Sequence, residues 1–147
     1  MNNRVSHIDL EKTGELLERK IKEQGYVVKD IQEYLKLAGK VARRAVAEIA
    51  DEEGIFPYEG KDDCGLFRGI YFRYVYELTT VSDEFADLEK VILENARFLA
   101  ENGRNADGLI GGHWECIKEG TVDLAQHLSA VMVLEMAEKV LAKGKSI

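Results

Sequence analysis

Hydrophobic residues recur along this chain at spacings of three and four. From about Val28 to Ala50 they form one stripe that a helix would place on a single face, made up of Ile31, Leu35, Ala38, Ala42, Ala45 and Ile49. Because this stripe is one-sided and apolar, another helix must cover it. Alternation with a period of two, which would predict a strand, extends over no useful length. The pattern therefore predicts an all-α protein.

Capping and breaking residues predict four more helices. Their starting points are, in chain order, Ser6 or Asp9, Leu66 after Pro57, Ser82 or Asp83, and Thr121. The first of them runs through Gln24 and the second ends near Thr80. We expect the five helices to pack with these side chains inside: Ile31, Leu35, Ala42, Phe67, Ile70, Tyr74, Leu78, Ile92, Leu99, Leu128 and Met132.

Two helices end in the same short sequence pattern, an acidic residue followed by glycine and an apolar pair. Gly54 and Gly108 occupy matching places in the two breaks and are 54 positions apart. The unit of helix, glycine turn, loop and helix predicts stacked αα-hairpins, which close into an α/α toroid or stack as a solenoid. The connecting loops, 53–63 and 103–121, are then the expected place for a ligand.

Composition narrows the class of protein. A chain of 147 residues with 46% hydrophobic and 32% charged residues can bury one core, and its net charge of −7 disfavours nucleic acid and anionic lipid as partners. Cys64 and Cys116 lie far apart, no apolar leader follows Met1, and no run is long enough to span a bilayer. We expect a cytoplasmic protein with reduced thiols and no membrane partner.

Several motifs then occur in a recognisable order. They are Asp63-Cys64-Gly65-Leu66-Phe67-Arg68-Gly69-Ile70-Tyr71-Phe72-Arg73-Tyr74, Asn95-Ala96, Asn105 to Gly111, Trp114, and Asp123 to Ala130. Together with the hairpin start at Tyr34 they resemble the end of a family 76 glycoside hydrolase, the α-1,6-mannanase family, over roughly residues 34–142. Arg68 stands where that family usually has lysine.

This resemblance implies part of an (α/α)6 toroid that acts on α-1,6-linked mannose chains through two carboxylates, which a retaining enzyme holds about 5 Å apart. In the family the two catalytic aspartates are adjacent on a loop in the first half of the domain, and that half has no counterpart here. The pair Asp62-Asp63 lies in a later motif, so we assign no catalytic residue. We expect a catalytically incomplete, carbohydrate-related protein that needs no cofactor.

The resemblance makes Asp63, Arg68, Arg73 and Trp114 the candidate substrate-binding residues, with a mannose-containing oligosaccharide as the ligand. Each also has a plainer interpretation. Asp63 suits a helix cap, the arginines can extend to solvent or pair with carboxylates, and Trp114 can serve as a hydrophobic lid instead of a stacking platform. The segment His113-x-x-Cys116 is a weak half of a zinc site, so we predict no metal.

The first 33 residues have a different pattern from residues 34–147, which carry the hairpins. The stretch from Ile8 to Leu37 resembles the first two helices of a helix-turn-helix repressor, but no recognition helix follows it. A regulatory helix-turn-helix module or a purely structural helical module is therefore the alternative function. Because part of a toroid leaves apolar helix faces open, we also expect a homo-oligomer.

Overall fold

The computed structural model describes residues 19, 23, 28–58, 60, 62–111, 114 and 121–143. Of the helix predicted to run through Gln24, only Arg19 and Glu23 are described, and both are helical. The chain divides into two compact units, Met1–Leu37 and Ala38–Ile147. The second unit contains almost all of the described residues.

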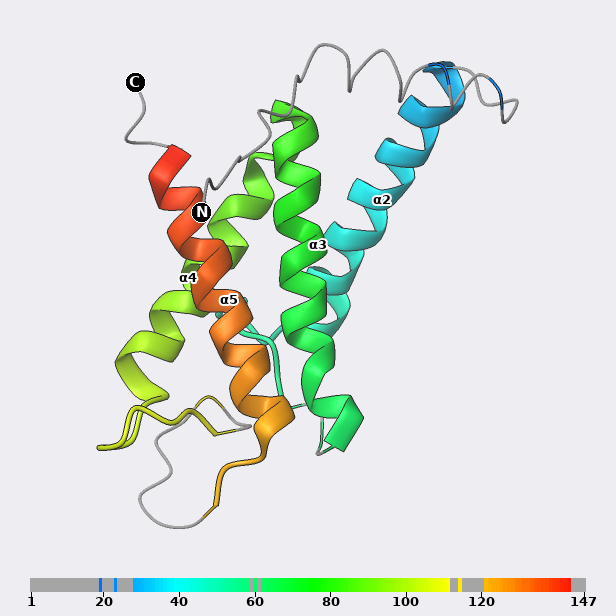
Figure 1. Ribbon diagram of the computed structural model, residues 1–147. Helices are drawn as coiled ribbons and strands as arrows, with labels where there is room; N and C mark the ends of the chain where they lie inside the picture. Colours follow the sequence, from blue (N-terminus) through cyan, green and yellow to red (C-terminus); the bar gives the residue numbers. More distant parts are fainter. Residues whose placement is uncertain are drawn as a thin grey trace, which may run out of the picture. The chain divides into compact units, whose positions relative to one another are not determined.

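Helices make up nearly all of the regular structure (Figure 1). They are α2 (Val28–Ile49), α3 (Phe67–Val81), α4 (Asp87–Asn102) and α5 (Leu124–Lys143), with 3-10 turns η1 (Asp62–Leu66) and η2 (Asp83–Phe85). Across the described ranges there is no strand, and the one β-bridge joins Arg104 and Ile110. The predicted all-α class is confirmed, and the four helices lie where the sequence pattern places them.

Two of the helix starts are capped by short polar side chains. The Ser82 hydroxyl accepts a hydrogen bond from the Glu84 amide at 3.2 Å. The Asp123 carboxylate accepts from the amides of Ala125 at 3.0 Å and Gln126 at 3.2 Å. These contacts satisfy amides that have no partner within the helix. Ser82 is thus a cap of η2, whereas α4, which the sequence placed behind Ser82 or Asp83, begins after Ala86 with no side-chain cap. Helix α5 is capped by Asp123 and not by Thr121.

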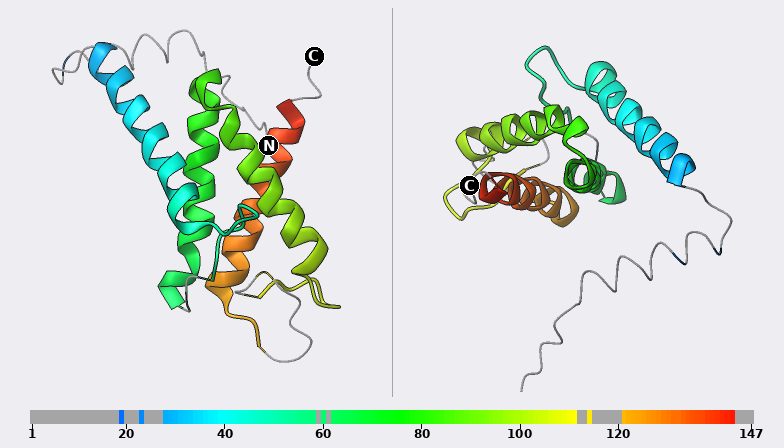
Figure 2. Two further views of the ribbon diagram at one scale, coloured as in Figure 1. Left: turned by 180° about the vertical axis from the view of Figure 1, so that it is seen from behind. Right: turned by 90° about the horizontal axis from the view of Figure 1, so that it is seen from above.

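Helices α3 and α5 are parallel and touch along their length, with α4 running against both on one side (Figure 2). Near their starts, the Gly69 amide donates to the Ser129 hydroxyl at 2.7 Å. A Cβ atom on Gly69 would lie 2.7 Å from the Ser129 Cα, so only glycine permits this approach.

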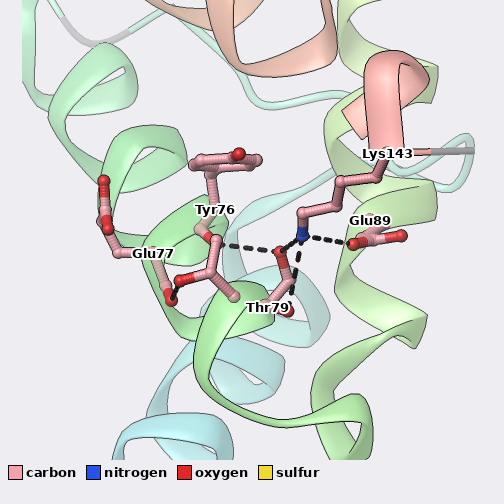
Figure 3. A network of polar contacts seen from close by, with 6 residues as sticks. Tyr76, Glu77, Thr79, Glu89 and Lys143 are labelled. Carbon is pink, nitrogen blue, oxygen red and sulfur yellow. Dashed lines mark hydrogen bonds and ion pairs between the residues drawn. The ribbon is translucent and has the colours of Figure 1, made fainter. Parts of the chain in front are cut away.

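The other end of the helix pair is closed by a polar network around Lys143 (Figure 3). Its ammonium donates to the Glu89 carboxylate on α4 at 2.9 Å and to the Thr79 hydroxyl on α3 at 3.3 Å. The same ammonium lies 4.9 Å from the centre of the Tyr76 ring. One side chain at the end of α5 therefore joins all three helices.

The core lies between α3, α4 and α5. Its fully or nearly fully buried apolar side chains are Phe72, Val75, Phe85, Leu88, Ile92, Leu99, Ile110, Trp114, Ala130, Val133 and Met136. The predicted burial of Ala42, Leu78, Ile92 and Leu99 is confirmed.

Four of the predicted core residues are exposed instead. Phe67, Ile70 and Tyr74 on α3 and Leu128 on α5 are between 39% and 68% exposed. The prediction was wrong for these residues because apolar side chains occupy most of the circumference of α3. Spacing alone then does not determine which side of the helix is covered.

Candidate functional site

Two matching turns open the long loops of the structure. In the first, the Asp51 carboxylate accepts from the amides of Glu53 at 2.9 Å and Ile55 at 2.8 Å, and the Asp51 amide donates to the Ile55 carbonyl at 3.0 Å. Gly54 has φ +81°, a left-handed conformation that favours glycine. The turn directs Ile55 and Phe56 into the core.

The second turn repeats this bonding 54 positions later. The Asn105 side-chain oxygen accepts from the amides of Asp107 at 3.0 Å and Leu109 at 2.8 Å, and the Asn105 amide donates to the Leu109 carbonyl at 3.0 Å. Gly108 has φ +79°. The shared geometry confirms that the repeated sequence pattern forms the same turn at both positions.

Each turn is attached to a different helix. The Asn95 side chain on α4 accepts from the Phe56 amide at 3.0 Å and donates to the Gly54 carbonyl at 2.9 Å, with no exposed surface. At the second turn, the Ile110 amide donates to the His127 Nδ1 atom on α5 at 3.2 Å. Both loops therefore start from fixed positions.

A buried arginine connects the two loops. The Arg68 guanidinium lies 4.1 Å above the Trp114 ring and donates to the Phe56 carbonyl at 3.2 Å. Phe72 is a further neighbour of Trp114, with the two ring centres 6.1 Å apart. Cation–π contact is strongest when the cation is desolvated, as it is here. This cluster fixes the loop that carries Trp114 against the one that carries Phe56.

Gln126, at the start of α5, binds the loop that carries Phe56. Its side-chain amide donates to the Gly60 carbonyl at 2.8 Å and to the Tyr58 hydroxyl at 3.2 Å. The sequence indicates Gln126 and Asn95 only as members of family motifs. Their role as buried anchors depends on tertiary contacts that no spacing reveals.

The predicted site residues are not all found together. Arg68 and Trp114 form one cluster, but their exposed fractions are 1% and 0%. Sugar contact through these two side chains stays a prediction, and it requires the Trp114 loop to open. Asp63 lies in η1, directly before α3, but its side chain is outside the described residues. Arg73 is exposed on a different side of α3 from Arg68.

Tyr71 joins this cluster to the helix before it. Its hydroxyl donates to the Ala42 carbonyl at 3.0 Å, and its ring packs 4.8 Å from that of Phe56. Burial raises the pKa of Tyr71 to about 12, since a phenolate would be poorly solvated there. Tyr71 is therefore neutral at physiological pH and acts as a hydrogen-bond donor.

Within the part of the chain that the structure describes, no group of three histidine, cysteine, aspartate or glutamate side chains could hold a metal ion. His113 and Cys116, the proposed half of a zinc site, lie outside the described residues. None of the described helices is both long and apolar enough to cross a membrane.

Comparison with known proteins shows which solved structures this arrangement resembles. No protein-family model matches the sequence, and no curated protein matches it either. Among solved structures, the chain is similar to the GH76A α-1,6-mannanase of Salegentibacter sp. HEL1_6, with 35% identity and a TM-score of 0.67 over 74% of this chain and 33% of that enzyme.

Two further structures give the same result. One is an inactive variant of the same mannanase, with two adjacent aspartates replaced, in complex with α-1,6-mannotetrose; it has 36% identity and a TM-score of 0.67 over 74% of this chain and 34% of that one. The other is the Lin0763 protein of Listeria innocua, with 30% identity and a TM-score of 0.68 over 76% of this chain and 32% of that one.

These proteins are about three times longer than the part that matches, so the chain spans about one third of their length. The mannanases have an α/α toroid fold, to which consecutive hairpins such as α3–α4–α5 contribute. The agreement in sequence and in structure makes this chain a relative of the glycoside hydrolase family 76 α-1,6-mannanases that corresponds to part of their toroid.

Proposed function

We propose that this chain is a carbohydrate-binding relative of the α-1,6-mannanases, with α-1,6-linked mannooligosaccharide as its ligand. The observation that carries the proposal is the similarity to an enzyme whose inactive variants were solved with mannotetrose and mannotriose bound. The two anchored loops support it, because loops held on a rigid helical scaffold are where such proteins place their ligands.

We propose binding without cleavage for this stretch of chain. Retaining hydrolysis needs two carboxylates on opposite sides of one glycosidic bond, held by the surrounding structure. The chain spans about one third of its mannanase relatives, and replacing two adjacent aspartates inactivates the Salegentibacter enzyme. The adjacent pair Asp62-Asp63 directly precedes α3 in this chain, and we give it no catalytic role.

The candidate residues take different parts in this proposal. Asp63 is the residue proposed to contact the sugar, since η1 directly follows the loop that Gln126 and Arg68 hold. Arg68 and Trp114 fix the loop position, and they contact sugar only if the Trp114 loop opens. Arg73 adds a positive charge on the exposed side of α3. A groove of this extent buries little of an oligosaccharide, so binding should be weak.

A binding isotherm tests the proposal directly. Mannotetrose titrated into the protein should give saturable binding with a dissociation constant in the millimolar range, corresponding to roughly −4 kcal/mol. Asp63→Asn should weaken it, while Asp83→Asn, exposed beyond the far end of α3, should leave it unchanged. Absence of saturation at the highest soluble mannotetrose concentration, or equal affinity for an unrelated β-linked oligosaccharide, would count against the proposal.

The proposal also includes the cellular location, the oligomeric state and the partners of this protein. A cytoplasmic location is supported by Cys64, an exposed free thiol of the kind that reducing compartments preserve. A homo-oligomer is supported by the apolar side chains exposed on α3 and α5. The net charge of −7 supports the expectation that nucleic acid is not a partner.

A further inference from the structure

One face of the α3–α5 pair is apolar, and no described residue buries it. Its six exposed side chains, between 39% and 69% accessible, are Phe67, Ile70, Tyr74, Leu124, Leu128 and Val131. On each helix they follow spacings of three and four, so they lie in one stripe, away from most of the buried residues of that helix. We call this set the open face. Figure 1 views α3 and α5 with α4 behind them.

The two stripes lie at the same height along the parallel helices. Gly69 rests against Ser129, which places Ile70 on a level with Leu128. Contacts at Thr79 and Lys143 keep the helices in step to their ends. The open face is therefore a two-helix surface with three apolar side chains from each helix. Patches of this kind rarely remain exposed in a soluble protein.

Charges of opposite sign border the open face, one on each helix. Arg73 extends from α3 and Glu135 from α5, and both are exposed. The pKa of Glu135 lies below its ordinary value because Lys139 donates it a hydrogen bond at 2.9 Å, and the positive charge of Arg73 adds to that effect. Counted from the Gly69–Ser129 contact, Arg73 lies four residues further along α3 and Glu135 six residues further along α5, so the two lie within about 3 Å of one level.

We infer that the open face binds a second copy of this chain, related by a two-fold axis that runs parallel to α3 and α5. This symmetry places α3 of one copy over α5 of the other without changing heights along the helices. The apolar stripe of α3 then meets the apolar stripe of α5, and Arg73 of each copy faces Glu135 of the other. This inference specifies the interface of the proposed homo-oligomer and does not depend on sugar binding.

Charge reversal in two separate variants tests the pairing. Arg73→Glu alone puts two carboxylates together at both contacts of a dimer, and Glu135→Arg alone puts two cations together at both. A mixture of the two variants restores opposite charges at both contacts, although each chain keeps its own altered charge. Repulsion inside a chain is the same in monomer and dimer, so only contacts between copies explain a recovery.

Sedimentation equilibrium at matched concentrations gives the readout. We expect a dimer for the unaltered protein, a dissociation constant raised at least tenfold for each variant, and a return to dimer on mixing. Arg97→Glu, an exposed arginine on α4, is the matched control and should remain dimeric. Ile70→Glu should be monomeric alone and in both mixtures, with an unchanged helical circular dichroism spectrum.

Two results would overturn the inference, and they differ in what else they affect. If the protein is a monomer at every concentration, both this interface and the proposed homo-oligomer are wrong. The open face is then covered by the N-terminal segment or by another mannanase-like polypeptide, or it faces solvent. A dimer that none of the α3 and α5 variants weakens keeps the homo-oligomer but moves it to another surface. Mannotetrose binding is measured in a separate titration, so neither result decides whether the protein binds the sugar.

Discussion

The two faces of the α3–α5 pair are similar in composition but differ in what covers them. Phe72 and Val133 have no exposed surface, whereas Phe67 and Leu128 on the same helices are accessible to solvent. Hydrophobicity alone therefore does not define the core of this protein. A side chain is buried where loops and a third helix are anchored over it, as Asn95, Arg68 and Gln126 anchor them here.

Truncating an aromatic side chain on each face should show this difference most strongly. Phe72→Ala should cost about 3 to 5 kcal/mol of unfolding free energy, because it removes a ring that packs on Phe56 and Trp114. Phe67→Ala, five residues earlier on α3, should change that free energy by less than about 0.5 kcal/mol in the monomer. Urea unfolding at high dilution measures both, and equal losses would contradict the assignment of the two faces.

The loop over the covered face should depend on one amide side chain. Asn95→Ala leaves the buried Phe56 amide without its acceptor and should cost about 2 to 3 kcal/mol. Asn102→Ala is the matched control, since Asn102 makes one exposed bond to the Phe98 carbonyl on the same helix. Hydrogen exchange of the Phe56 amide should quicken only in the first variant. A similar rate in both would show that Asn95 does not hold the loop.

Close approach of the two helices should be sensitive to a single methyl group. Gly69→Ala should destabilise by about 1 to 2 kcal/mol, because the new Cβ meets the Ser129 backbone and the gain in helix propensity offsets only part of that overpacking. Ile70→Ala, one residue further on the open face, provides the comparison and should be nearly neutral in the monomer. If Gly69→Ala proved stabilising, the close contact between α3 and α5 would be in doubt.

Acid should have the smallest effect, because the covered face relies on packing more than on charge. Arg43 pairs with Asp87 at 2.7 Å and holds the pKa of that carboxyl below its ordinary value. A lowered folded-state pKa stabilises the fold fully above the unfolded pKa near 4, and this contribution is lost as the pH falls through the folded value.

Since both side chains of this pair are more than one third exposed, their contribution should stay below about 1 kcal/mol. Unfolding curves at pH 7 and at pH 3 for the original protein and for Asp87→Asn provide the measurement. The difference between the two proteins should shrink at the lower pH. A constant difference would mean that the ion pair is not the source.

The helices and turns of this protein were largely predictable from its sequence. Local effects of single residues can be predicted from the sequence alone. Such residues are Pro57, the capping Ser82, and the glycines at 54 and 108. The same local logic explains why the two turns share one hydrogen-bond pattern 54 residues apart.

The covered side of α3 was not predictable in this way, since apolar residues surround most of that helix. The candidate site was predictable only in part. Arg68 and Trp114 were identified through family motifs, but their stacking inside the core arises from loops that are distant in sequence. Exposure of a side chain is a property of the whole fold, and the spacing of residues along one helix does not report it.

The central claim is that this chain is a relative of the α-1,6-mannanases that binds their ligand without cleaving it. Incubation of the purified protein with α-1,6-mannan, followed by measurement of new reducing ends, tests this most directly. We predict no release above the protein-free control, at concentrations where mannotetrose binding is measurable. Release of reducing ends that Asp63→Asn abolishes, with the helical fold intact, would contradict the claim and make the chain an enzyme in its own right.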